Sequence, residues 1–121
     1  DVEDQEALYQ LGEGWVAEES VAIAIYCSIK YQDDFEEAII AAANHDGDSD
    51  STAAITGNIV GARVGYKNIP DYYKDNIELK DVILELADDM AKNMPLKKID
   101  GRHLEPTDEW LDKYLYLEKK D

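Results

Sequence analysis

Carboxylates alternate with small residues in the stretch from His45 to Asn58, which reads HDGDSDSTAAITGN. Asp46, Asp48 and Asp50 stand at every second position, and a hydroxyl follows at Ser51. Three carboxylates this close repel one another unless a cation or a proton is shared between them. Hard divalent cations such as Mg²⁺ prefer a shell of oxygen ligands of this kind. The pattern therefore indicates a cation site. The alternative is a solvated acidic turn that caps the start of a helix.

A calcium loop of the D-x-D-x-D-G type is a further interpretation of the same stretch, and its spacing does not fit. Such a loop needs a glycine at its sixth position and a bidentate glutamate at its twelfth. Counted from Asp46, the sixth residue is Ser51 and the twelfth is Gly57. The sequence therefore argues against this type of calcium site.

The longer string GDSDSTAAITGNIVGA resembles the C-terminal metal motif of the ADP-ribosylglycohydrolase family, of the dinitrogenase-reductase-activating glycohydrolase and ADP-ribosylarginine hydrolase type. That motif reads G-D-[ST]-D-[ST] and runs into a helix of small residues. The upstream segment GEGWVAEESVAIAIYCSI looks like the segment before the motif, where glycines and an aromatic residue open a buried helix. The resemblance covers most of residues 12–66, and its metal motif is specific.

The resemblance implies a hydrolase that cleaves the bond between ADP-ribose and a modified side chain or small molecule. Members of the family bind two divalent ions, usually Mg²⁺ or Mn²⁺, and the motif then makes Asp48, Asp50 and Ser51 metal ligands. Gly14 and Trp15 are the corresponding candidates for substrate binding, since Trp15 matches an aromatic position in the ADP-ribose pocket. Core packing is an equal alternative for Trp15, because aromatic side chains carry a large apolar area.

Two polar neighbours of the motif receive no ligand role. Asp46 stands where many members of the family have glycine, so it is interpreted as an extra acid. His45 is interpreted as a surface histidine, because nothing in the sequence pairs it with a base or a second metal ligand. The alternative is that His45 orients a ligand or a water molecule.

The family's first metal cluster, a Thr-Asp-Asp type motif, has no counterpart before Gly12. Asp33-Asp34 lacks the preceding threonine and reads as a helix cap. The resemblance therefore implies that residues 1–121 form a single C-terminal segment of the domain. This segment would hold half a metal site and no complete catalytic apparatus, and the catalytic residues are expected in the N-terminal part. Two alternatives stay open: a non-catalytic ADP-ribose- or metal-binding module, and a structural helical domain.

Composition limits the partners and the compartment. Twelve basic residues against 28 acidic ones give a formal net charge of -16, which argues against nucleic-acid binding through a basic patch. Cys27 is the only cysteine, so no intrachain disulfide can form, and its apolar surroundings predict an inert core residue. No signal peptide or spanning segment is recognisable, so we expect a cytoplasmic protein without membrane contact.

Apolar periodicity predicts an all-α fold of orthogonally packed helices. Helices are expected over residues 3–11, 15–31, 35–44 and 79–94. Further helices are expected after the acidic loop, in a short turn after Pro70 and after a cap at Thr107. Residues 96–106 are interpreted as a polar loop. Gly57, Gly61 and Gly65 lie four apart and predict a close-packing face. The helix at 15–31 is apolar nearly all round, so we expect it to be covered by the N-terminal part of its own domain or by self-association. The other expected partner is an ADP-ribosylated protein or ADP-ribose derivative.

Overall fold

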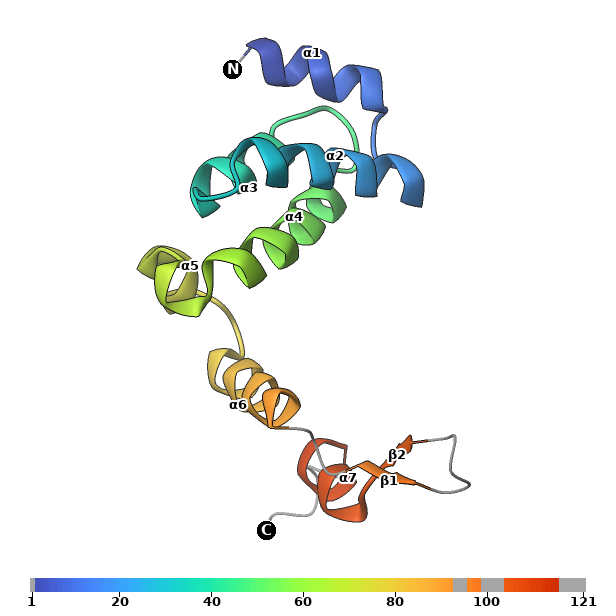
Figure 1. The fold of residues 1–121 in the computed structure, drawn as a ribbon, viewed down its shortest axis with the longest axis vertical. Coiled ribbons are helices and arrows are strands. Elements are labelled where there is room, and N and C mark those ends of the chain that lie inside the picture. Colours follow the sequence, from blue (N-terminus) through green and yellow to red (C-terminus); the bar gives the residue numbers. More distant parts are fainter. Residues whose placement is uncertain (1, 93–95, 99–103, 116–121) are drawn as a thin grey trace. The chain divides into compact units, whose positions relative to one another are not determined.

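A computed structural model describes residues 2–92, 96–98 and 104–115, which fall into two compact units, Asp1–Asn76 and Ile77–Asp121. Figure 1 shows that the elements are mainly helical in both units, which confirms the predicted all-α class. The first unit contains α1 (Val2–Leu11), α2 (Ala17–Lys30), α3 (Phe35–Ala43), α4 (Ser49–Val64), the 3₁₀ turn η1 (Tyr66–Asn68) and α5 (Asp71–Asp75). None of the described helices is long and apolar enough to span a membrane.

Helix α4 packs against both α2 and α3 and forms the centre of the first unit. The side chains of Ile23, Cys27 and Val60 are completely buried there. Burial raises the pKa of the Cys27 thiol to about 11, so the thiol stays protonated and unreactive at neutral pH. The prediction of an inert core cysteine is therefore confirmed.

Two of the three glycines predicted to form a packing face lie at helix contacts. A Cβ at Gly57 would lie 3.2 Å from Cδ1 of Ile39 on α3, which is tighter than ordinary contact. A Cβ at Gly61 would meet Cε2 of Phe35 at 3.6 Å, an ordinary van der Waals distance. The prediction is wrong for Gly65, whose Cβ would meet nothing within 4 Å. This residue ends α4 with a φ of 76°, a conformation that favours glycine.

A buried carboxylate attaches α1 to α2. Asp4 is 5% exposed and accepts hydrogen bonds from Lys30 Nζ at 2.5 Å, Tyr31 Oη at 2.5 Å and Tyr26 Oη at 3.0 Å. Burial alone would raise the pKa of Asp4, but these three donors outweigh it and leave the pKa below its ordinary value. The first helix is therefore held on α2 by a charge-assisted network as well as by Leu8 in the core.

The second unit contains α6 (Lys80–Ala91), β1 (Leu96–Lys98), β2 (Leu104–Pro106) and α7 (Asp108–Tyr114). The prediction that residues 96–106 form only a polar loop is wrong, because β1 pairs antiparallel with β2 in the register Leu96 to Pro106. Three-residue strands carry too little alternation to be recognised from the sequence. Thr107 caps α7 as predicted, accepting a hydrogen bond from the Trp110 amide. The predicted helix end at Pro95 lies outside the described residues.

Candidate functional site

The acidic motif spans the end of the loop between α3 and the first turn of α4. Asp48 occupies the N-cap position of α4, yet its side chain caps no backbone N–H group. The pKa of the Asp50 carboxyl is lowered, first by the neighbouring Asp48 side chain and then by the backbone N–H groups of Asp50 and Ser51. The alternative of an acidic turn that caps the helix therefore does not hold for Asp48, whereas Asp50 does interact with backbone N–H groups of the first turn. Two carboxylates in contact are arranged to share a proton or a cation.

The predicted metal ligands lie together at one helix start. Asp48 and Ser51 are half-buried and Asp50 is exposed, all within the first turn of α4 and the residue before it. Among the described residues, no group of three or more histidine, cysteine or carboxylate side chains is placed to hold a metal ion. Two carboxylates and a hydroxyl suit a hard cation, although Mg²⁺ requires six ligands in near-octahedral geometry. The donors present therefore fit part of a metal shell.

The backbone of Glu13 fixes the acidic loop. Its carbonyl accepts a hydrogen bond of 2.8 Å from the Asp48 amide. A Cβ at Gly47 would lie 1.8 Å from that same carbonyl oxygen, a distance no pair of atoms can adopt. Glycine is therefore required at position 47 so that the loop can approach Glu13. This contact brings the segment before α2 against the start of α4.

The turn that precedes α2 is held by two side chains from that helix. Glu19 accepts hydrogen bonds through Oε2 from the amides of Gly14, at 3.0 Å, and Glu13, at 3.2 Å. Ser20 donates its hydroxyl to the Gly14 carbonyl at 2.5 Å. Gly14 itself is buried, with a φ of 81°, and a Cβ there would lie 3.6 Å from the carbonyl oxygen of Asp48. The structure thus places a predicted substrate-binding residue directly against a predicted metal ligand.

Trp15 lies on the surface beside this turn. Its side chain is 66% exposed, and the indole N–H donates to the Glu13 carboxylate at 3.0 Å. The alternative interpretation of Trp15 as a core residue is therefore wrong for this chain. An exposed indole held by a hydrogen bond offers a flat apolar face next to the acidic loop.

His45 and Thr52 form a network that the sequence did not reveal. Gly47 donates its amide to Nδ1 of His45 at 3.1 Å, and Nε2 lies 2.9 Å from the hydroxyl of the completely buried Thr52. Thr52 in turn donates to the Ala42 carbonyl at 2.7 Å. His45 is half-buried and bonded through both ring nitrogens, so its interpretation as a simple surface histidine is wrong. Thr52 directly follows the acidic motif in the sequence. There it is indistinguishable from the other small residues of the run, so it gave no sign of this network.

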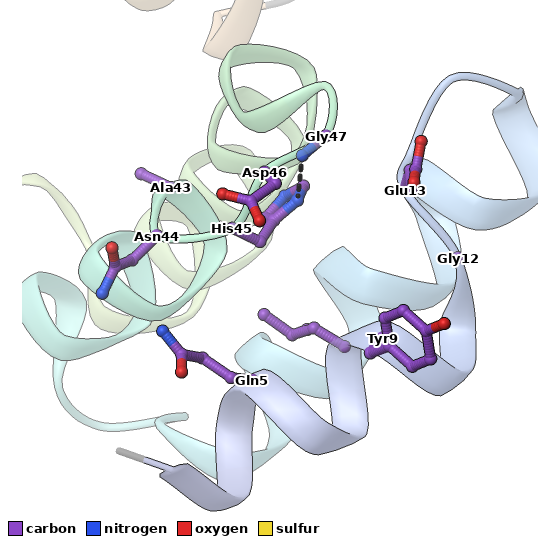
Figure 2. Close-up of a pocket in the computed structure, with 10 residues that line it drawn as sticks. Gln5, Tyr9, Gly12, Glu13, Ala43, Asn44, His45, Asp46 and Gly47 are labelled. Carbon is purple, nitrogen blue, oxygen red and sulfur yellow. Dashed lines mark hydrogen bonds between the residues drawn. The ribbon is translucent and has the colours of Figure 1, made fainter.

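A cavity of about 370 Å³ lies between α1 and the loop that leads to the motif. Figure 2 shows Gln5 and Tyr9 of α1 on one side of it and Asn44, His45 and Asp46 on the other. Asp46 is exposed and lines this cavity. The first residues of the loop therefore line a cavity, whereas its last residue, Asp48, lies at the start of α4 beside Asp50.

Comparison with known proteins gives matches to one family. The ADP-ribosylglycohydrolase family model matches residues 1–99. The chain is 45% identical over 63 residues to the ADP-ribosylarginine hydrolase Tri1 of Serratia proteamaculans, across 52% of this chain and 17% of that protein. It is 30% identical over 87 residues to the ADP-ribosylhydrolase ARH3 of Mus musculus, across 64% of this chain and 24% of that protein.

The matched parts amount to less than a quarter of either curated relative. No solved structure matches the chain. The family match nevertheless includes the turn before α2, the acidic loop and the whole of α4. The chain therefore belongs to the ADP-ribosylglycohydrolase family.

Proposed function

We propose that this chain supplies the C-terminal half of a divalent-metal site in an ADP-ribosyl hydrolase. Asp48, Asp50 and Ser51 would hold Mg²⁺ or Mn²⁺, as part of a two-ion site in the complete domain. The observation that carries the proposal is the grouping of Asp48, Asp50 and Ser51 at the first turn of α4, where none of the ion pairs of the described residues involves either carboxylate. An acidic pair at a helix start with no cationic side chain paired to it is explained by a cation shared between the two carboxylates.

The chemistry proposed is hydrolysis of the bond between ADP-ribose and a modified side chain or small molecule. Cleavage at the ribose carbon passes through a transition state with oxocarbenium character. A bound divalent ion would supply Lewis-acid polarisation and orientation of oxygen groups. The role of Asp48, Asp50 and Ser51 is to fix that charge at one point of the site. Their own position is set by the Asp48 amide bonded to Glu13 and by the first turn of α4.

Gly14 and Trp15 are proposed to contact the ADP-ribose part of the substrate. Gly14 brings the backbone close to the start of α4, where an added Cβ would meet Cγ2 of Thr52 at 3.0 Å and the Asp48 carbonyl oxygen at 3.6 Å. Trp15 presents an exposed indole beside it, and aromatic faces bind nucleobase or sugar surfaces through dispersion. Substrate and metal would therefore meet at the contact between the 12–16 turn and the start of α4.

The N-terminal part of the same domain is proposed as the source of the remaining metal ligands and of the catalytic acid or base. Two observations support this proposal: the described residues hold no complete metal-ligand group, and the curated relatives are more than four times as long as the matched segments. The second candidate, a non-catalytic ADP-ribose- or metal-binding module, rests on the same incomplete shell. A deADP-ribosylation assay with and without the N-terminal part distinguishes them, since only the fragment of an enzyme gains activity when that part is added.

Calorimetric titration with Mn²⁺ and Mg²⁺ tests the metal site. Asp48→Ala and Asp50→Ala should each weaken binding by about tenfold or more, as expected when a charged ligand is lost. Asp46→Ala is the matched control, because it removes the same charge from the same loop and should leave binding within about twofold. Unchanged metal affinity in both Asp48→Ala and Asp50→Ala would refute the assignment.

A further inference from the structure

The cavity between α1 and residues 43–47 is acidic and partly aromatic. Two acidic residues, Glu13 and Asp46, line it, and the Glu13 carboxylate also accepts from the Trp15 indole N–H at 3.0 Å. Gln5 and Asn44 add residues with side-chain amides, and the 84% exposed Tyr9 adds an aromatic residue. None of the described residues that line the cavity is a lysine or an arginine. In Figure 2 the amide of Gln5 extends from α1 toward Asn44 and His45, across the cavity. The cavity thus combines negative charge, carbonyl acceptors and an aromatic surface.

These groups match the requirements of an organic cation. A guanidinium or ammonium group donates hydrogen bonds to carboxylates and amide carbonyls and has no acceptors of its own. A planar guanidinium also stacks on aromatic rings, and a tyrosine ring attracts a cation placed over its face. A volume of about 370 Å³ accommodates a side chain of the size of arginine. An anionic group would instead meet an acidic lining without a lysine or arginine, in a chain of net charge -16.

We propose that this cavity is a subsite for an unmodified arginine side chain of the polypeptide that carries ADP-ribose. The inference rests on the proposed function and adds to it the chemical character of the macromolecular substrate. Gly47 lines the cavity and directly precedes Asp48, so a polypeptide bound here lies next to the proposed metal site. The acidic lining disfavours the diphosphate of ADP-ribose, and this argument assigns the cavity to the polypeptide part of the substrate.

The α1 wall of the cavity is fixed before any ligand arrives. Asp4, one residue before Gln5, is bonded to Lys30, Tyr26 and Tyr31 of the α2 region. Leu8, which also lines the cavity, is 2% exposed and belongs to the core. The opposite wall is fixed by the bond from the Gly47 amide to His45. A preformed cavity loses little conformational entropy on binding, which favours recognition of a single side chain.

The test uses NMR titration of the metal-free chain with a short arginine-containing peptide and the same peptide carrying citrulline in place of arginine. Citrulline keeps the size and planarity of the side chain and removes the charge. The arginine peptide should shift the amide resonances of Tyr9 and Asp46 saturably. It should bind at least about fivefold more tightly than the citrulline peptide, the ratio expected of an exposed cation–π contact combined with an ion pair. Equal affinity for the two peptides would overturn the proposal.

Variants locate the subsite. Asp46→Asn and Tyr9→Ala should each lower the affinity for the arginine peptide about threefold to fivefold, whereas Glu18→Gln, which removes one exposed charge outside the cavity, should not. Equal losses in Asp46→Asn and Glu18→Gln would show attraction by net charge only and refute the subsite. Agmatine binding as tightly as the peptide would refute the polypeptide assignment. Because metal is absent throughout, these results are independent of whether Asp48 and Asp50 bind a cation.

Discussion

Nε2 of His45 lies 2.9 Å from Oγ1 of Thr52, and this contact joins the acidic loop to the buried face of α4. The Gly47 amide donates to Nδ1, so the ring proton resides on Nε2 and is donated to Thr52. The Thr52 hydroxyl can then donate to the Ala42 carbonyl at the end of α3. One buried hydroxyl therefore connects both ends of the loop that carries the motif.

Removal of the Thr52 hydroxyl should destabilise the chain. Thr52→Val preserves the side-chain shape and leaves the Ala42 carbonyl and His45 Nε2 without this partner. The expected loss in free energy of unfolding is about 1–3 kcal/mol. Thr56→Val is the matched control, because Thr56 is equally buried but donates only to the Thr52 carbonyl of its own helix. Urea unfolding should show a clearly larger loss for Thr52→Val, and equal losses would contradict the bridging role.

Two glycine substitutions should have opposite effects. Gly47→Ala forces a Cβ to 1.8 Å from the Glu13 carbonyl, so the loop must move and the Asp48 amide must lose its bond to Glu13. A loss of more than about 2 kcal/mol in unfolding free energy and weaker Mn²⁺ binding are expected. Gly61→Ala places its Cβ at an ordinary 3.6 Å from Phe35 in a helix interior, and should stabilise the chain by up to about 1 kcal/mol. Chemical denaturation of both variants measures the two changes in unfolding free energy, and changes of the same sign would contradict this prediction.

The Asp4 network predicts a pH dependence of stability. Because the folded-state pKa of Asp4 lies below its ordinary value of 3.8, the unfolded chain binds the proton more tightly. The stabilisation is therefore fully present above the unfolded pKa and is lost as the pH falls through the lower folded pKa. Asp4→Asn should cost about 1–3 kcal/mol at pH 7 and reduce the fall in stability below about pH 4.

Asp33→Asn provides the comparison for this prediction. Asp33 also forms an ion pair, with Arg63 at 3.1 Å, but its side chain is 77% exposed. Exposed pairs contribute about 0–1 kcal/mol, so this variant should behave like the unmodified chain at both pH values. Urea titrations at pH 7 and pH 3 measure the difference. Identical pH profiles for Asp4→Asn and the unmodified chain would contradict the assigned role of Asp4.

Local signals in the sequence predicted the helices, whereas tertiary contacts decided the site. Residue type and spacing alone placed a helix cap at Asp33 or Asp34, and the structure assigns it to Asp34, which accepts from the Glu37 amide. The requirement for glycine at position 47 does not, because it depends on Glu13, which is 34 positions earlier in the chain. The exposure of Trp15 was equally invisible, since an aromatic residue before an apolar helix is compatible with either a core or a surface position.

The same limit applies to residues bonded across the fold. Asp4 gives no sequence signal, because its three donors lie more than 20 residues away on a different element. A lone acid in a short helix reads as a solvated residue by default. The motif from Asp48 to Ser51 was recognisable because its chemistry is encoded in consecutive residues. The contacts that hold the motif were not, because Glu13, His45 and Thr52 lie in separate segments of the chain.

The exposed face of α2 predicts association with a partner. Val21, Ile25 and Ile29 are spaced four residues apart on one side of the helix and are 43%, 46% and 70% exposed. An apolar stripe of this kind marks an interaction surface, so the chain should self-associate or bind the N-terminal part of its domain. Ile25→Glu should weaken this association, because a charge in an apolar contact must be desolvated. Gln32→Glu adds the same charge at an exposed position outside the stripe and is the control. Sedimentation at several concentrations, with and without the N-terminal part, measures both outcomes, and a chain that stays monomeric and unbound in every mixture would show that this face has no partner.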